Sequence, residues 1–215
     1  MGAIARSAAN NITTSGVFTS SAIANSSVTG ITVLANASDG ITLISSQTAS
    51  NSASLSFTSG LTSTYKAYKF VLVNVHPVSQ YVDLVVDYST DSGSNYNVVQ
   101  TTTFFGAYHE EANAYEGLEY YLANDVAQAT SPSLVDNAGS ASDASISGTL
   151  TLFNPSSTTY VKHWIASMSI DQNGVQATSH SAGYANTTSA INAIRFSFVR
   201  TAVNFDGKIY LYGIK

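Results

Sequence analysis

Residues 65–75 read YKAYKFVLVNV, and this stretch decides the fold. Aromatic and β-branched residues favour strands, and the run becomes entirely apolar at Phe70–Val73. The Val-rich segment Tyr81–Tyr88 has the same character. Both segments predict long strands in a chain that shows almost no helical periodicity.

The rest of the chain after residue 40 alternates apolar with small polar residues, which is typical of strands with one buried face. The further strands are expected at 41–44, 53–57, 96–105, 145–153, 160–170, 177–184, 191–199 and 208–214. The turn-forming segment Ser89–Asn95 predicts that strand 96–105 returns antiparallel to strand 81–88. About ten strands predict an all-β fold for residues 41–215, an antiparallel β-sandwich (jelly-roll-like) with an extended N-terminal arm.

The alternation also predicts which side chains are buried. We expect the core to draw on Leu55, Phe57, Phe70, Leu72, Leu84, Val86, Leu150, Leu152, Trp164, Phe196, Phe198 and Leu211. Neighbouring residues of a strand point to opposite faces, so His163 and Trp164 should lie on different sides of their sheet.

Residues 1–40 form the predicted arm, and only Arg6 and Asp39 carry charge there. Its apolar residues recur every five or six positions, a period of neither helix nor strand. The spacing fits extended pieces packed on other chains, and it also fits a low-complexity linker. The arm is too short to bury a core of its own. Its apolar residues are the candidate assembly interface: Ile12, Val17, Phe18, Ile23, Val28, Ile31 and Val33.

Residues 106–145 are expected to form a long excursion with a helical turn near 116–128. This segment contains every glutamate of the chain: Glu110, Glu111, Glu116 and Glu119. With His109 they offer metal-ligand chemistry, but their spacing matches no ligand pattern, so we expect a solvated loop and no metal. The segment Asp91–Asn95 lacks the acidic ligands of a calcium loop, and we expect a plain turn.

Composition excludes several function classes. The 215 residues carry a formal net charge of −5, and the eight Lys and Arg are scattered, so we expect no nucleic-acid partner. No apolar run reaches the length of a spanning helix, and we expect no membrane partner. The chain has no Cys and no nucleophile, phosphate-binding or zinc motif. We therefore predict no enzymatic activity and no cofactor.

The 13 Tyr permit two interpretations. Tyr is a common strand residue, and this structural interpretation comes first. Exposed Tyr beside Asn and Ser also forms an adaptable recognition surface, and aromatic faces can stack on sugars.

Several stretches resemble small β-rich virion proteins of tailed bacteriophages, marine and cyanobacterial phages in particular. They are FVLVNVHP at 70–77, DYSTDSGSNY at 87–96, LFNPSS at 152–157, AGYANTTSAIN at 182–192 and GKIYLYGIK at 207–215. The segment AANNITTSG at 8–16 is similar to lead-ins of phage fibre proteins. The resemblance covers residues 41–215 and identifies a structural family without an active site.

The resemblance implies a non-enzymatic structural component of a virion surface, either a capsid decoration (cement) protein or a fibre protein. It also implies a homotrimer that contacts capsid or tail proteins, because such assemblies are symmetric and commonly threefold. The alternative is a receptor- or glycan-binding tail fibre or tip. A third hypothesis, a depolymerase with paired carboxylates, could draw only on Glu110–Glu119 and a few scattered Asp.

Overall fold

A computed structural model describes residues 40–199 and 203–215. The predicted arm and its candidate interface residues therefore lie outside the described residues. Within the described ranges the chain forms thirteen strands and no helix, so no helix there could cross a membrane. Every strand pairing is antiparallel, which confirms the all-β prediction.

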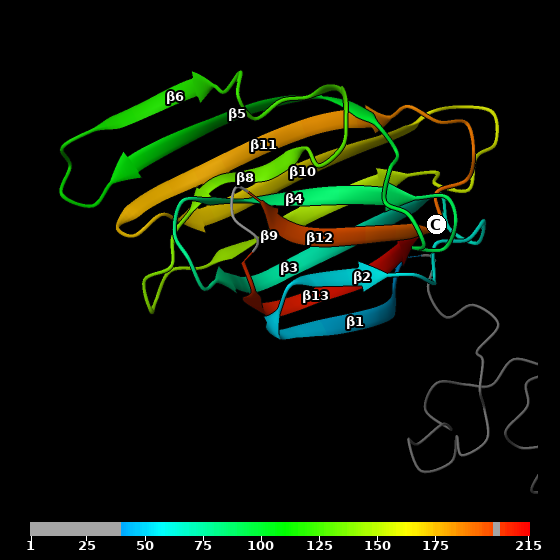
Figure 1. Cartoon of the computed structure of the whole chain (residues 1–215), viewed down its shortest axis with the longest axis horizontal. Coiled ribbons are helices and arrows are strands. Elements are labelled where there is room, and N and C mark those ends of the chain that lie inside the picture. Colours follow the sequence, from blue (N-terminus) through cyan, green and yellow to red (C-terminus); the bar gives the residue numbers. More distant parts are fainter. Residues whose placement is uncertain (1–39, 200–202) are drawn as a thin grey trace, which may run out of the picture. The chain divides into compact units, whose positions relative to one another are not determined.

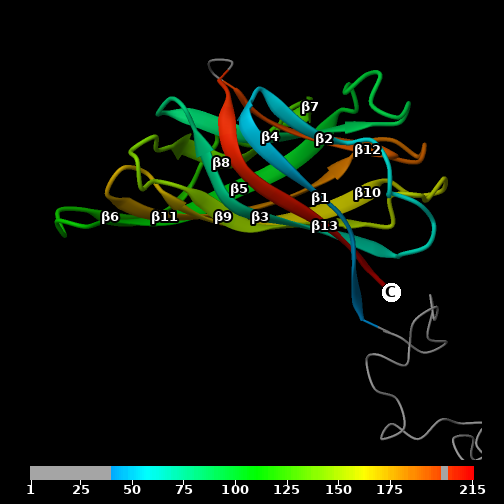
Figure 2. The same ribbon diagram turned by 90° about the horizontal axis from the view of Figure 1, so that it is seen from below.

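The strands form two sheets that pack face to face (Figures 1 and 2). The larger sheet has the order β1 (Ile41–Ser52), β13 (Phe205–Ile214), β3 (Ala67–Pro77), β9 (Ile146–Phe153), β10 (Lys162–Asp171), β11 (Val175–Ala185), β5 (Gln100–Glu110), β6 (Glu116–Tyr120), with β7 (Ala127–Ala129) also paired to β5. The smaller sheet has the order β2 (Ser54–Phe57), β12 (Ala193–Val199), β4 (Val82–Ser89), β8 (Ser133–Ala138).

The connectivity is that of a jelly roll. The first and last strands, β1 and β13, pair in the larger sheet, and the next pair inward, β2 and β12, lies in the smaller one. The nesting continues with β3 beside β9 and β4 beside β8. Eight strands thus form the two four-stranded layers of a jelly roll. Two insertions, β5–β7 and β10–β11, widen the larger sheet beyond β9.

The predicted antiparallel pairing of strands 81–88 and 96–105 is wrong. β4 lies in the smaller sheet and is paired on one side with β12 and on the other with β8. These two neighbours occupy both edges of β4, so β5 has no edge with which to pair. All eight residues of β4 are buried. The turn at Asp91–Asn95 therefore carries the chain across the sandwich to the other sheet.

The predicted helical turn near 116–128 is also wrong. Residues 106–110 continue β5, and β6 pairs back onto it from Glu116 to Tyr120. Successive side chains of β6 point to opposite faces of the sheet, as in any strand. One face carries Glu116, Leu118 and Tyr120, and the other carries Gly117 and Glu119. Residues 106–120 of the expected excursion thus form a hairpin that widens the larger sheet, and Figure 1 shows it reaching beyond the smaller sheet. Residues 133–138 of the same segment form β8 of the smaller sheet.

The core lies between the two sheets and matches the prediction. All twelve side chains expected in it are buried. The rings of Phe57, Phe70 and Phe196 meet there with centroids 5.4–6.5 Å apart. Trp164 is fully buried whereas His163 is exposed, so the predicted division of these two residues between the faces of β10 is confirmed.

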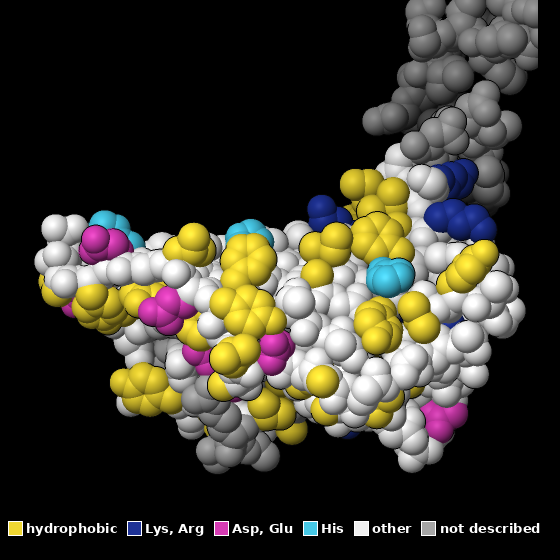
Figure 3. Space-filling model, turned by 90° about the horizontal axis from the view of Figure 1, so that it is seen from above, with side chains coloured by type: hydrophobic (Ala, Val, Ile, Leu, Met, Phe, Trp, Pro, Cys, Tyr) yellow, Lys and Arg dark blue, Asp and Glu magenta, His cyan; other side chains and the backbone are white. Residues whose placement is uncertain are grey.

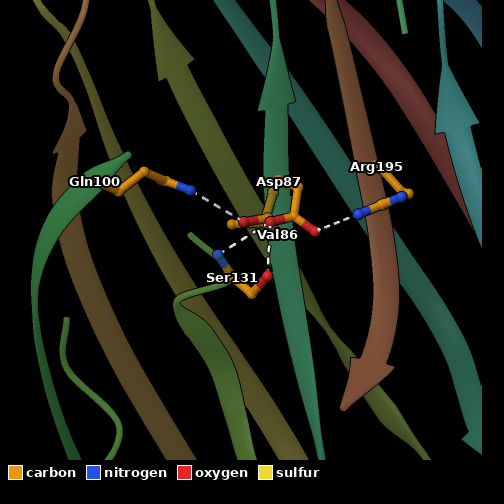
Figure 4. A network of polar contacts seen from close by, with 5 residues as sticks. All are labelled: Val86, Asp87, Gln100, Ser131 and Arg195. Carbon is orange, nitrogen blue, oxygen red and sulfur yellow. Dashed lines mark hydrogen bonds and ion pairs between the residues drawn. The ribbon is translucent and has the colours of Figure 1, made fainter. Parts of the chain in front are cut away.

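A buried glutamine joins the two sheets at the centre of this core. Gln100, at the start of β5, donates from Nε2 to the Val86 carbonyl of β4 at 3.1 Å (Figure 4). Its Oε1 accepts a hydrogen bond from Trp164 Nε1 at 2.9 Å. All three residues are fully buried. Because a buried polar group without a partner is costly, this arrangement fixes how the sheets are aligned.

The neighbouring Asp87 forms a second part of this network (Figure 4). One carboxylate oxygen accepts hydrogen bonds from the backbone nitrogen and hydroxyl of Ser131, at 3.0 and 2.8 Å. The other pairs with Arg195 on β12 at 3.0 Å. Asp87 is 2% exposed, and these bonds compensate for its burial. The segment before β8 is thereby held against the smaller sheet.

We predict that Gln100→Leu destabilises the domain by about 2–4 kcal/mol, because the Trp164 Nε1 group and the Val86 carbonyl both lose their partner in an apolar interior. Denaturant unfolding measures the change. Gln176→Leu is the matched control, since Gln176 is an exposed strand glutamine, and it should change stability by less than about 0.5 kcal/mol. Equal effects of the two variants would refute the role of Gln100.

Candidate functional site

A surface groove of about 490 Å³ lies where the β5–β6 hairpin meets β8 and the β10–β11 turn. Four tyrosines line it: Tyr81, Tyr108, Tyr115 and Tyr121. The polar side chains of its lining are Glu119, Asp136, Asn137, Gln172 and Asn173. We call this site the tyrosine groove. Its volume is in the range of about 300–1,000 Å³ that small-molecule sites occupy.

Tyr81 enters the groove from the residue before β4 in an unusual backbone conformation. Its φ is +60°, a region that bulky residues rarely adopt. A hydrogen bond from its backbone nitrogen to the Ala138 carbonyl, 2.9 Å, holds the chain there. Beside it, Asn173 Nδ2 donates to Gln80 Oε1 at 2.9 Å. The β10–β11 turn is thereby tied to the segment that presents Tyr81, whose side chain is 63% exposed.

The β5–β6 hairpin supplies the opposite side of the groove. Tyr108 on β5 lies across Gly117 on β6, where a Cβ atom would lie 2.6 Å from the tyrosine ring and hydroxyl. A larger residue at position 117 would therefore displace the Tyr108 ring from this place. The hydroxyl of Tyr108 donates to Glu119 Oε1 at 2.8 Å. Tyr115, in the hairpin turn, has its ring centroid 6.0 Å from that of Tyr108.

The floor of the groove carries a largely buried carboxylate, Asp136 on β8. Its two oxygens accept hydrogen bonds from Asn124 Nδ2 at 2.9 Å and Asn137 Nδ2 at 2.7 Å. Gln172 Nε2 donates to the backbone carbonyl of Asp136 at 2.7 Å. Neutral amide donors thus compensate the buried charge and connect β8 with the β10–β11 turn.

The carboxylates alter the acidity of the tyrosines. The hydrogen bond to Glu119 is the largest cause that raises the pKa of Tyr108, followed by desolvation. Burial is the largest cause that raises the pKa of Tyr121, and the negative charges of Glu119 and Asp136 add to it. Both phenols therefore stay protonated at neutral pH, so the Tyr121 hydroxyl can donate a hydrogen bond to a ligand as the Tyr108 hydroxyl donates to Glu119. The lining contains no Lys, Arg or His, so its polar groups are phenol hydroxyls, side-chain amides and carboxylates.

The outward face of the larger sheet is a second surface feature. Eight well-exposed apolar side chains share this face: Ile41, Leu43, Val73, Phe105, Leu118, Tyr120, Phe153 and Ile165. A depression of about 410 Å³ lies there beside Phe153, His163 and Tyr184. In Figure 3 hydrophobic and His side chains gather over this region. Outer strand faces are usually polar, so this face is unusually apolar.

The structure places the Glu-rich segment on the β5–β6 hairpin instead of on a loop. Glu119 reaches the groove, whereas Glu110 accepts from the Ala114 backbone nitrogen at 3.1 Å inside the hairpin turn. His109 contacts Asn113 Oδ1 at 3.0 Å. In residues 40–199 and 203–215 no three His, Asp or Glu side chains are placed to hold a metal ion.

Sequence reasoning missed the groove itself. Its lining comes from segments around residues 81, 108–121, 136 and 172–175, which no spacing rule connects. The one available signal was the abundance of Tyr, interpreted first as strand chemistry. For the described residues that interpretation is incomplete, because Tyr115 lies in a turn and Tyr81 precedes its strand.

Comparison of the chain with protein-family models, with curated proteins and with solved structures found no match.

We predict that Glu119→Gln lowers the pKa of Tyr108 and Tyr121 toward the ordinary value of 10.0, because it removes the negative charge that disfavours both phenolates. A ¹³C NMR titration of labelled tyrosines measures this change. As the matched control, Asp125→Asn should lower the pKa of Tyr120, which donates to Asp125 at 2.6 Å, and leave Tyr108 unchanged. An unaltered Tyr108 in Glu119→Gln would contradict the described groove.

The turn at Asp91 generates a prediction for acid stability. A hydrogen bond from Ser89, and then those from Asn95, lower the pKa of Asp91 from 3.8 to about 2. A lowered pKa adds stability above the unfolded value of 3.8, and this stability is lost as the pH falls toward about 2. Asp91→Asn should therefore lose less stability over that interval than the native chain, measured by denaturant unfolding at each pH. Asp143→Asn, at an exposed aspartate outside the turn, is the control and should follow the native curve.

Proposed function

We propose that this chain is a non-enzymatic structural component of a bacteriophage virion surface, of the capsid decoration (cement) or fibre type. The observation that carries the proposal is the jelly-roll connectivity, an architecture of viral coat domains. The resemblance of residues 41–215 to small phage virion proteins supports the same class. Function is not implied by fold alone, so the two supports are needed together.

The chemistry of the tyrosine groove supports a non-enzymatic role. Catalysis by paired carboxylates needs one acid with a raised pKa and one ionised partner. Here Glu119 accepts from Tyr108, and both oxygens of Asp136 accept from amides. These contacts occupy one oxygen of Glu119 and both oxygens of Asp136 with neutral donors. The groove therefore resembles a binding site more than an acid–base pair.

We propose that the protein acts as a homo-oligomer, with a trimer expected from the resemblance, in contact with capsid or tail proteins of the virion. The apolar outward face of the larger sheet supports such contacts, because a large apolar patch is a common feature of protein interfaces. The arm at residues 1–40 is the proposed anchor, with the candidate interface residues given above.

A second candidate function is recognition of host surface glycans by a tail fibre or tip. The tyrosine groove favours it, because aromatic faces and neutral hydrogen-bonding groups converge there at an exposed site. The two functions are compatible, since a virion surface protein can also bind a host receptor.

We predict that deleting residues 1–40 leaves a folded, soluble β domain that is no longer incorporated into particles, because the anchor is lost while the core of 41–215 stays intact. Mass spectrometry of purified particles measures incorporation, and circular dichroism checks the fold. As a matched variant, the full chain carrying Ser at Ile12, Val17, Phe18 and Ile23 should be incorporated poorly. Native incorporation of the deletion variant would disprove the anchoring role.

A further inference from the structure

Two tyrosines present their rings to solvent at the tyrosine groove. Tyr81 is 63% and Tyr115 is 48% exposed. They come from opposite sides of the groove, the start of β4 and the β5–β6 turn. An aromatic face is apolar and carries partial negative charge, so it attracts the positively polarised C–H groups of a sugar ring. Tyr also loses little conformational entropy on binding.

Polar atoms beside these rings are open to a ligand. Among the described residues no hydrogen bond is made by the hydroxyls of Tyr81, Tyr115 and Tyr121. Glu119 accepts from Tyr108 through Oε1 alone. The groove thus offers phenol groups that can donate or accept and a carboxylate oxygen that can only accept. The hydroxyl groups of a sugar match this set, because each of them can both donate and accept.

The charges of the groove restrict which sugars can enter. Its lining holds Glu119 and Asp136 and no basic side chain. Glu110 and Glu116 lie on the same hairpin. Most of the acidic side chains visible in Figure 3 lie toward the β5–β6 end of the molecule, whereas Lys and Arg lie toward the other end. A carboxylated or sulfated sugar would meet like charges at this end.

We infer that the tyrosine groove binds neutral pyranose sugars, stacked on Tyr81 and Tyr115 and hydrogen-bonded to Glu119, and that it rejects acidic sugars. The inference rests on the second candidate function, recognition of a host glycan, and it names the ligand class and the site. Phage attachment to a neutral cell-surface polysaccharide would use this class of ligand.

Binding of the full-length protein to matched oligosaccharides tests the inference. The probes are a neutral oligosaccharide of glucose or galactose and the same oligosaccharide with one uronic acid, each titrated by calorimetry. We expect the neutral probe to bind and the acidic probe to bind at least tenfold more weakly. The double variant Tyr81→Ala with Tyr115→Ala should lose at least tenfold in affinity. Tyr160→Ala is the matched control, since Tyr160 is 71% exposed outside the groove, and it should bind as the native chain does.

A variant that changes the charge of the groove tests its selectivity independently of the position of the site. Glu119→Gln should reduce the ratio of the affinity for the neutral probe to that for the acidic probe, because it removes one of the two negative charges in the lining. Native affinity in the double tyrosine variant would refute the assignment of the binding site to Tyr81 and Tyr115. Tighter binding of the acidic probe would overturn the selectivity. Binding of neither probe would overturn the inference, whereas the virion proposal would still be decided by mass spectrometry of particles.

Discussion

The buried hydrogen bonds of Gln100 are the constraint on which the rest of the structure depends. Gln100 begins β5 in the larger sheet and bonds to β4 in the smaller one, while Trp164 bonds to it from β10. An interior hydrogen bond tolerates little displacement, because both partners are costly when unpaired. The position of β5 across the sandwich is thereby fixed. Since β5 carries Tyr108 and pairs with the strand that carries Glu119, the groove is positioned by the same contact.

Much of the fold could be predicted from the sequence, because apolar alternation reports local burial. Phe70, Leu72 and Trp164 follow strand periodicity, and each is buried as expected. Pairing depends on non-local partners, which alternation does not reveal. The turn at Asp91–Asn95 reads as a hairpin, yet β4 has both neighbours supplied by β12 and β8 from distant parts of the chain. The β5–β6 hairpin was missed because its short, acidic second strand has little apolar signal.

The groove could not be predicted for a related reason. Tyr81 and Tyr115 are 34 residues apart and line a common groove only when the β5–β6 hairpin is placed beside β8. The positive φ of Tyr81 is held by a hydrogen bond to Ala138, which is still more remote in sequence. Residue counts gave the abundance of Tyr, and the tertiary structure was needed to show which of them converge. The apolar outward face could not be predicted for the same reason. Phe105 and Ile165 lie on this face together only because β5 and β10 both pair with β11.

These features give the jelly roll two distinct surfaces, an apolar sheet face and a polar, aromatic groove. We propose contact with virion proteins for the first surface and sugar binding for the second. A cryo-electron microscopy reconstruction of the intact particle tests this division of roles most directly. The account predicts density for the jelly roll on the particle surface, with the tyrosine groove open to solvent. A chain absent from the particle, or a groove covered by a neighbouring virion protein, would contradict it.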